Sequence, residues 1–309
     1  MTSDAAATET ALPTGEQLEI QHGPWRAVVT EVGAALRVLQ HDGRDLVDGF
    51  PPEARVKGCR GQQLLPWPNR VRDGLYEFGG EQLQLDLSEP KRHNAIHGLV
   101  RWVSWTTLEH TASSLTQEVV VHPQQGWPGT VRASVTHTLG DDGLTVDVRA
   151  RNIGPVAVPF GYAAHPYFGV GQERVDDIAV QVPASTYLEV DDRLLPVALH
   201  PVDGRPEDLR PGTELGDRVL DTAFTGLSRE EDGRWRVRLS RGEREVVLWG
   251  EEGLDWIQVF TGEHRRDLGL AVEPMTCGPD AFNPGPTHDG VLVLAPGDDF
   301  SCRWGVTGR

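Results

Sequence analysis

Short runs in which apolar and polar residues alternate constrain the fold of this chain more than any other feature. Residues 144–150 place Leu, Val, Val and Ala on one side of an extended backbone and Thr, Asp and Arg on the other. Residues 83–87 and 235–239 repeat the pattern, and residues 131–139 and 256–261 are also predicted strands. A period of two is typical of strands that lie with one face on a core and the other in water.

Turn signals separate these strands at short intervals. Asp-Gly pairs occur at 42–43, 73–74, 142–143 and 232–233, and a Gly-Gly pair occurs at 79–80. The 309 residues include 35 Gly and 22 Pro, and hardly any segment keeps a helical period over the length of a helix. Many turns and few helices favour an all-β fold, a large antiparallel β-sandwich, over alternating strand–helix units.

The pattern predicts one domain. Residues 1–15 are small, polar and without period, so we expect a disordered tail there. Residues 16–309 are predicted to form a single β-sandwich domain. Within it, residues 190–220 are rich in Pro, Asp, Arg and Gly and are expected to be a long irregular loop, which is typical of functional or mobile segments.

Composition narrows the range of partners and compartments. The 29 Lys and Arg against 46 Asp and Glu give a net charge of −17, which repels phosphate backbones and anionic lipid, so we expect no nucleic-acid or membrane partner. A secretion signal and a long apolar run are absent from the sequence, which favours a cytoplasmic protein. Cys59, Cys277 and Cys302 are too few and too widely spaced for a disulfide framework or a usual structural zinc site.

Cofactor motifs are missing as well. The sequence has no GxGxxG, GxxxxGK[ST], HExxH or GxSxG motif, so we expect no nucleotide cofactor. His93 and His97 are four residues apart, the spacing of two zinc ligands on a helix, but the residues around them do not predict a helix. We therefore predict no metal site.

Two residues that precede prolines are candidates for acid–base chemistry. His165 follows an apolar run and precedes Pro166, so it either projects into a cavity or is a core histidine bonded to a backbone carbonyl. Glu273 also follows an apolar run and precedes Pro274. A partly desolvated carboxylate there is either a general base or one half of a salt bridge at the rim of a sheet.

Polar and aromatic residues elsewhere could bind a sugar. Asn69 and Arg70 follow a proline-rich segment, and the planar donors of Arg70 suit hydroxyl and ring oxygens unless it is a surface arginine. Tryptophans near these segments are either platforms for a sugar ring or core residues: Trp67, Trp102, Trp105, Trp127 and Trp256.

Six motifs in a fixed order carry a family resemblance over residues 17–307. They are Pro68-Asn69-Arg70 with Asp73-Gly74, Ile96-His97-Gly98, His165-Pro166-Tyr167-Phe168, Asp221-Thr-Ala-Phe224, Ile257-Gln258-Val-Phe-Thr-Gly262, and Glu273-Pro274 with Pro279-Asp-Ala-Phe-Asn283. Together they resemble the aldose 1-epimerases, or galactose mutarotases. The resemblance implies the large sandwich of that family and a small-molecule aldose, such as glucose or galactose, as substrate.

The resemblance also implies residue roles. Glu273 would take the proton from O1 of the sugar and His165 would protonate the ring oxygen O5, so that the ring opens, turns about C1–C2 and closes as the other anomer. Ordinary pKa values of about 4.3 and 6.5 would supply a carboxylate and an imidazolium. This chemistry needs no cofactor. Residues matching sugar contacts are Arg70, His97, Asp221, Asn69, Tyr167 and Gln258, with Asp221 expected on the loop that ends there.

Two other functions stay open at this point. One is a hexose-6-phosphate 1-epimerase of the same superfamily, with Arg60, Arg72 and Arg101 as candidate phosphate ligands. The other is a sugar-binding module without turnover. The sequence leaves open which sugar is used and whether the chain is a monomer or a homodimer.

Overall fold

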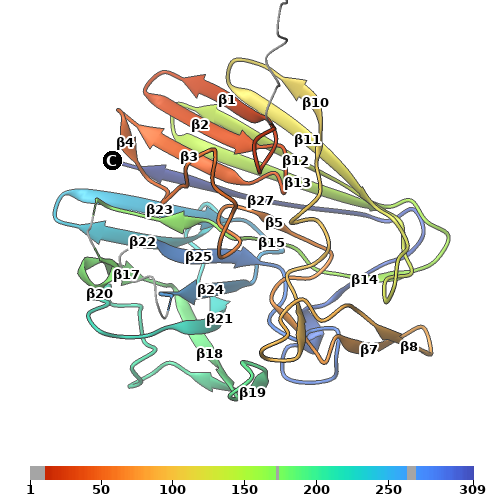
Figure 1. The fold of residues 1–309 in the computed structure, drawn as a ribbon. Helices are drawn as coiled ribbons and strands as arrows, with labels where there is room; N and C mark the ends of the chain where they lie inside the picture. Colours follow the sequence, from red (N-terminus) through yellow and green to blue (C-terminus); the bar gives the residue numbers. More distant parts are fainter. Residues whose placement is uncertain (1–10, 172–173, 263–268) are drawn as a thin grey trace, which may run out of the picture.

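The computed structural model describes residues 11–171, 174–262 and 269–309 (Figure 1). Within these residues the only helices are two single 3-10 turns, η1 (Val175–Asp177) and η2 (His288–Gly290). Every pairing between the strands is antiparallel. No helix in the described part of the chain is long and apolar enough to cross a membrane.

The largest sheet has nine strands and confirms the alternating pattern. Residues 144–150 lie in β13, where Leu144, Val146 and Val148 are buried and the residues between them are more exposed. In spatial order the strands are β10 (Thr106–His110), β11 (Ser114–Val121), β12 (Val131–Gly140), β13 (Gly143–Asn152), β27 (Asp299–Gly308), β23 (Arg244–Gly250), β22 (Trp235–Arg241), β17 (Ala179–Gln181) and β20 (Thr213–Glu214).

A second sheet of eight strands holds the residues of greatest chemical interest. In spatial order it contains β19 (Pro196–Pro201), β18 (Ala184–Val190), β21 (Asp221–Leu227), β24 (Trp256–Phe260), β25 (Leu270–Met275), β15 (Ala163–Ala164) and β5 (Gln63–Leu64), with β16 (Tyr167–Phe168) also paired to β25. All six residues of β25 are buried, unlike the alternating strands of the nine-stranded sheet.

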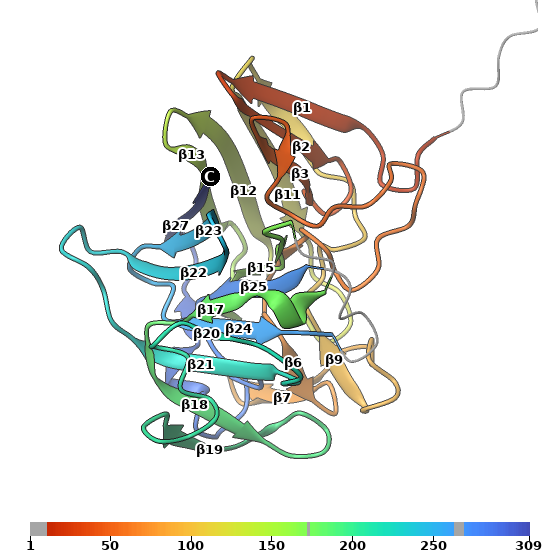
Figure 2. The same cartoon turned by 90° about the vertical axis from the view of Figure 1, so that its left-hand side faces the viewer.

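Smaller sheets complete the sandwich. They are β1 (Gln17–His22), β2 (Trp25–Thr30), β3 (Leu36–His41) and β4 (Arg44–Asp45) in one sheet, and the pairs β14 (Val158–Phe160) with β26 (Leu292–Leu294), β6 (Arg70–Arg72) with β9 (Asn94–Ile96), and β7 (Leu75–Phe78) with β8 (Glu81–Gln84). β1 and β2 pack against β11 and β12 (Figure 2). One core cluster includes side chains of the nine-stranded, eight-stranded and four-stranded sheets.

The predicted turns lie where the hairpins need them. Gly79 and Gly80 connect β7 to β8 and both have positive φ, +63° and +81°. This backbone is the type I′ turn, which matches the twist of the two strands and which glycine adopts without steric cost.

Three sequence expectations need correction. Residues 190–220 are not one irregular loop, because they contain β19 and β20; β19 is an edge strand with a proline at each end, where a missing N–H is tolerated. The alternation over residues 83–87 overstates β8, which ends at Gln84. Residues 1–10 of the predicted tail lie outside the described residues, whereas residues 12–15 form a turn in which Thr14 is buried.

Candidate active site

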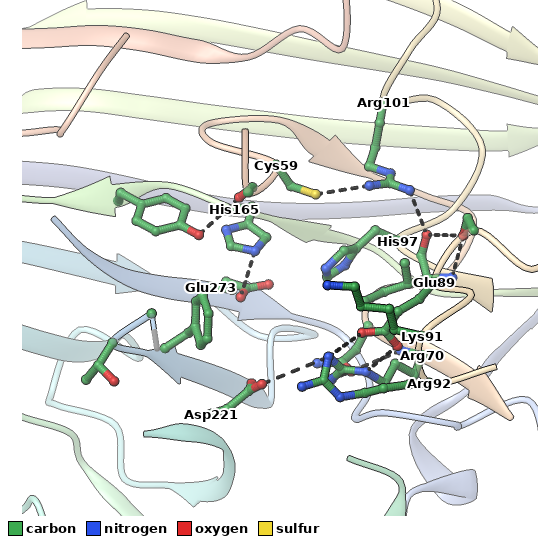
Figure 3. A pocket seen from close by; sticks show the side chains of 18 residues that line it. Cys59, Arg70, Glu89, Lys91, Arg92, His97, Arg101, His165, Asp221 and Glu273 are labelled. Atoms are coloured by element: carbon green, nitrogen blue, oxygen red, sulfur yellow. Dashed lines mark hydrogen bonds and ion pairs between the residues drawn. The ribbon is translucent and has the colours of Figure 1, made fainter. Parts of the chain in front are cut away.

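A pocket of about 640 Å³ opens beside the eight-stranded sheet. Its walls come from β6, β9, β16, β21, β24 and β25 and from segments that flank them, so the fold brings together side chains from residue 58 to residue 273 (Figure 3). The predicted site residues that line it are Asn69, Arg70, His97, His165, Tyr167, Asp221 and Glu273.

Glu273 lies inside β25 and not at its end as the sequence suggested. Gln258 on β24 is its partner across the strands, so both side chains share one face of the sheet. Glu273 is 2% exposed, and its Oε1 lies 3.2 Å from Nε2 of His165. Oε2 has no hydrogen-bond partner among the described residues. A buried carboxylate oxygen without a partner is costly, which indicates that a ligand hydroxyl belongs there.

His165 lies in the link between β15 and β16, held extended before Pro166. Its ring stacks on Tyr167, with centroids 5.2 Å apart, and meets His97 edge-on at 5.3 Å. Nε2 of His165 is directed at Glu273. This nitrogen is therefore not bonded to a backbone carbonyl, which was the alternative for a core histidine. Figure 3 shows the two side chains facing each other on one side of the pocket.

Burial sets the protonation of this pair. It raises the pKa of Glu273 well above the usual range, with the charge of Asp221 acting in the same direction. Burial also lowers the pKa of His165 to about 3, helped by the charges of Arg101 and Arg60. The sequence-based expectation of ordinary pKa values is therefore wrong for this pair. Because Glu273 Oε1 and His165 Nε2 are in contact, the protonation of one residue is coupled to that of the other.

Arg70 is not a surface arginine. It begins β6, and its Nε and Nη2 donate to the two carboxylate oxygens of Glu89 at 2.9 and 3.0 Å. Nη1 donates to Asn69 Oδ1 at 3.2 Å, and Nη2 lies 3.9 Å from Asp221 Oδ2. The bidentate pair with Glu89 fixes the guanidinium in the pocket wall.

Asp221 is the first residue of β21, so a strand delivers it and not the expected loop. Its Oδ1 accepts a hydrogen bond from Gln258 Nε2 at 2.6 Å, and Gln258 Oε1 accepts one from Asn69 Nδ2 at 3.3 Å. Gln258 therefore links the two residues from behind the pocket surface. Burial raises the pKa of Asp221 despite the opposing charge of Arg70.

The two histidines considered as metal ligands have different surroundings. His97 follows β9 in the pocket wall, where burial lowers its pKa well below the usual range. His93 precedes β9, is exposed and pairs with Asp73 at 2.9 Å. A strand separates them, so the helical spacing does not apply. In the described ranges, no group of three His, Cys, Asp or Glu side chains could hold a metal ion.

The candidate phosphate ligands are dispersed. Arg60 is buried under the ring of Tyr167 and lies 3.3 Å from Asp48. Arg72 lies 3.3 Å from Asp280, outside the pocket. Of the three arginines proposed from the sequence, Arg101 alone lines the pocket.

The tryptophans are not sugar platforms in the described walls. Those buried in the core are Trp67, Trp105, Trp127 and Trp256. Trp102 is exposed outside the pocket. The aromatic wall instead consists of Tyr167 and Phe260.

Several residues of the pocket wall were not predicted as such from the sequence. They are Cys59, Glu89, Lys91, Arg92, Arg101 as a wall residue, and Phe260. Glu89 precedes Pro90, so it repeats the Glu-Pro pair noted at 273–274 and could have been found by that signal. Phe260 stands in the motif over residues 257–262 and Arg101 is a candidate phosphate ligand, whereas Cys59, Lys91 and Arg92 carry no distinguishing pattern.

Comparisons with known proteins agree with this geometry. The sequence profile of the aldose 1-epimerase family matches residues 16–304. The chain is 33% identical to the uncharacterized protein YihR of Escherichia coli K12, over 96% of this chain and 94% of that protein. It is 30% identical to human galactose mutarotase, over 97% of each.

Solved structures share the fold. A GalM/aldose epimerase homologue from C. elegans superposes with a TM-score of 0.83 at 20% identity, covering 95% of this chain and 98% of that one. Galactose 1-epimerase from Lactobacillus acidophilus gives a TM-score of 0.78 at 20% identity, covering 94% and 92%. The expected antiparallel β-sandwich is confirmed, and the family profile spans nearly the whole domain. The chain belongs to the aldose 1-epimerase family.

Proposed function

We propose that this protein is an aldose 1-epimerase that interconverts the α and β anomers of an aldohexose such as glucose or galactose. The observation that supports this best is the buried contact of 3.2 Å between Glu273 and His165 on the wall of a sugar-sized pocket. The name of the human relative, galactose mutarotase, agrees with this activity.

The reaction needs one proton acceptor and one proton donor. The Glu273 carboxylate takes the proton of the O1 hydroxyl while the His165 imidazolium gives a proton to O5. The C1–O5 bond breaks, and the carbon becomes an aldehyde. After rotation about C1–C2, closure returns both protons along the reverse path and leaves the opposite anomer.

Burial favours the neutral forms of Glu273 and His165, so a bound sugar must stabilise their charged forms. The proton then moves from Glu273 Oε1 to His165 Nε2 across their contact. A sugar hydroxyl that donates to the unpaired Oε2 stabilises the carboxylate, since hydrogen bonds to the charged form favour that form. The charge of Arg70 acts in the same direction.

Neighbouring side chains are suited to hold the hydroxyl groups of the sugar. Asp221 can accept hydrogen bonds from them, and Arg70 can donate, each already fixed by its own partners. Such preorganised groups orient a sugar so that C1 and O5 face the acid–base pair.

The test is polarimetry of freshly dissolved α-D-glucose and α-D-galactose with the purified protein. We expect the approach to anomeric equilibrium to accelerate in proportion to protein concentration. Calorimetric titration with the same sugars separates the alternative: binding without acceleration would mean a sugar-binding module and would overturn the epimerase proposal.

A further inference from the structure

One side of the pocket is cationic, although the chain as a whole carries a net charge of −17. Lys91, Arg92 and Arg101 line this side, across from Glu273 in Figure 3. Lys91 is one of two lysines in the whole sequence. In so acidic a protein, most cationic side chains are expected to have a carboxylate nearby.

Carboxylates balance most of the described arginines. Examples with a carboxylate oxygen within 4.0 Å are Arg26, Arg60, Arg72, Arg151 and Arg303. In the pocket, Glu89 balances Arg70 and Arg92, and Asp221 lies beside Arg70 as well.

Arg101 is different. Its Nη1 donates to Cys59 Sγ at 3.1 Å and its Nη2 donates to the Ile96 carbonyl oxygen at 3.1 Å. Burial raises the pKa of Cys59, so both acceptors are neutral. No carboxylate of the described residues lies within 4.0 Å of Arg101, and the same holds for Lys91. Two positive charges at the pocket therefore have no carboxylate partner among the residues that the structure describes.

We propose that the sugar carries an anionic group at the end remote from its anomeric carbon, held by Arg101 and Lys91. The group is a phosphate, sulfate, sulfonate or carboxylate. This inference rests on the proposed function, because the pair Glu273–His165 fixes where the anomeric carbon lies. Lys91 and Arg101 lie on the side of the pocket away from Glu273 (Figure 3), so the end of the sugar opposite its anomeric carbon would face them.

The chemistry of the two side chains suits this role. Arg101 still has N–H donors beyond those bonded to Cys59 and Ile96, and a guanidinium matches the geometry of an oxyanion. Lys91 is exposed and flexible, so it adds a charge that can follow the ligand. A neutral hexose would leave both charges uncompensated.

The experiment compares four sugars in calorimetric titrations and in polarimetry. They are glucose, glucose 6-phosphate, glucose 6-sulfate and glucuronic acid. For the protein without substitutions, we expect at least one charged sugar to bind at least tenfold more tightly than glucose and the preference to fall as salt is added. Comparing phosphate, sulfate and carboxylate identifies which anion the wall accepts.

Variants assign the effect to residues. Arg101→Gln and Lys91→Gln should each reduce the preference for the charged sugar over glucose at least tenfold. Arg55→Gln is the matched control for the first, because Arg55 and Arg101 both lie over the Trp102 ring, at 5.1 and 5.9 Å, but Arg55 is outside the pocket. Lys57→Gln is the control for the second, since it removes the other lysine. Lys91 is exposed, so its variant stays informative if Arg101→Gln does not fold.

The outcomes separate this inference from the proposed function. Acceleration of glucose anomerisation with no preference for any charged sugar overturns the anion site and leaves the epimerase proposal standing. Tight binding of a charged sugar without acceleration supports the anion site and overturns the epimerase proposal. An equal loss of preference in the two control variants would mean a general effect of net charge, and Arg101 and Lys91 would lose the role.

Discussion

The two large sheets bury histidine in contrasting ways. His137 on β12 of the nine-stranded sheet is fully buried, and both ring nitrogens lack a hydrogen-bond partner among the described residues. His165, beside β16 in the eight-stranded sheet, is also buried but contacts His97, Tyr167 and Glu273. Burial lowers both pKa values, that of His137 to about 4 and that of His165 to about 3. Burial alone therefore does not distinguish a site from a core.

The two histidines differ in the charged and polar side chains that surround them. Desolvation is the one cause of the pKa shift of His137, whereas the environment of His165 contains the charges of Arg101 and Arg60. Glu273 shares a face of the sheet with Gln258, which in turn bonds Asp221. Polar residues from distant parts of the chain converge on one sheet, and that convergence marks the site.

The largest effect is expected for Glu273→Gln. The amide keeps the shape of the side chain but cannot take the O1 proton, so turnover should fall about 10³- to 10⁴-fold. Asp280→Asn is the control, because Asp280 is also a buried carboxylate but bonds the Arg72 N–H and Asn283 outside the pocket. It should lower the Tm and keep turnover. Polarimetry and thermal unfolding measure both, and turnover of Glu273→Gln within threefold of the original would remove it from the base role.

The paired histidine variants test the contrast directly. His165→Asn should slow turnover at least about 10²-fold, the usual value of one positioned proton transfer. His137→Asn should leave turnover within twofold, since His137 is buried in β12 of the other sheet and outside the pocket. If the two variants lose activity equally, the contrast between the sheets is not one of function.

The two large sheets also differ in how well the sequence predicts them. The sequence predicts β13 closely because one face of this strand packs on the core and the other faces water. Apolar and polar residues therefore alternate along it. β25 is buried on both faces, so no alternation marks it. Glu273 is marked instead by the apolar run before it, by Pro274 after it and by the family resemblance. Arg101 and Lys91 were harder still, because their significance lies in which carboxylates are absent around them, a property of the folded chain.

A smaller effect is expected at Asp221, which binds and does not transfer protons in the proposed reaction. Asp221→Ala removes an acceptor for sugar hydroxyls and for Gln258, so KM should rise about tenfold while kcat falls less than about threefold. Steady-state kinetics and the Tm are measured together. A large fall in Tm with KM unchanged would make Asp221 a structural residue of β21.

The smallest expected effect concerns stability against pH, and it has opposite signs in the two sheets. Above pH 4.5 the folded chain keeps a proton on Glu273 that the unfolded chain releases, so this residue makes stability fall as pH rises toward its raised pKa. His137 has the opposite effect. Below pH 6.5 its side chain takes up a proton in the unfolded chain, but in the folded chain it stays neutral down to about pH 4. The stability of the folded state therefore falls as pH falls. Urea unfolding from pH 4 to 8 should therefore show Glu273→Gln gaining stability relative to the original as pH rises, by at most about 1.4 kcal/mol per pH unit. His137→Leu should gain as pH falls. Differences that do not change with pH would mean that neither proton is coupled to folding.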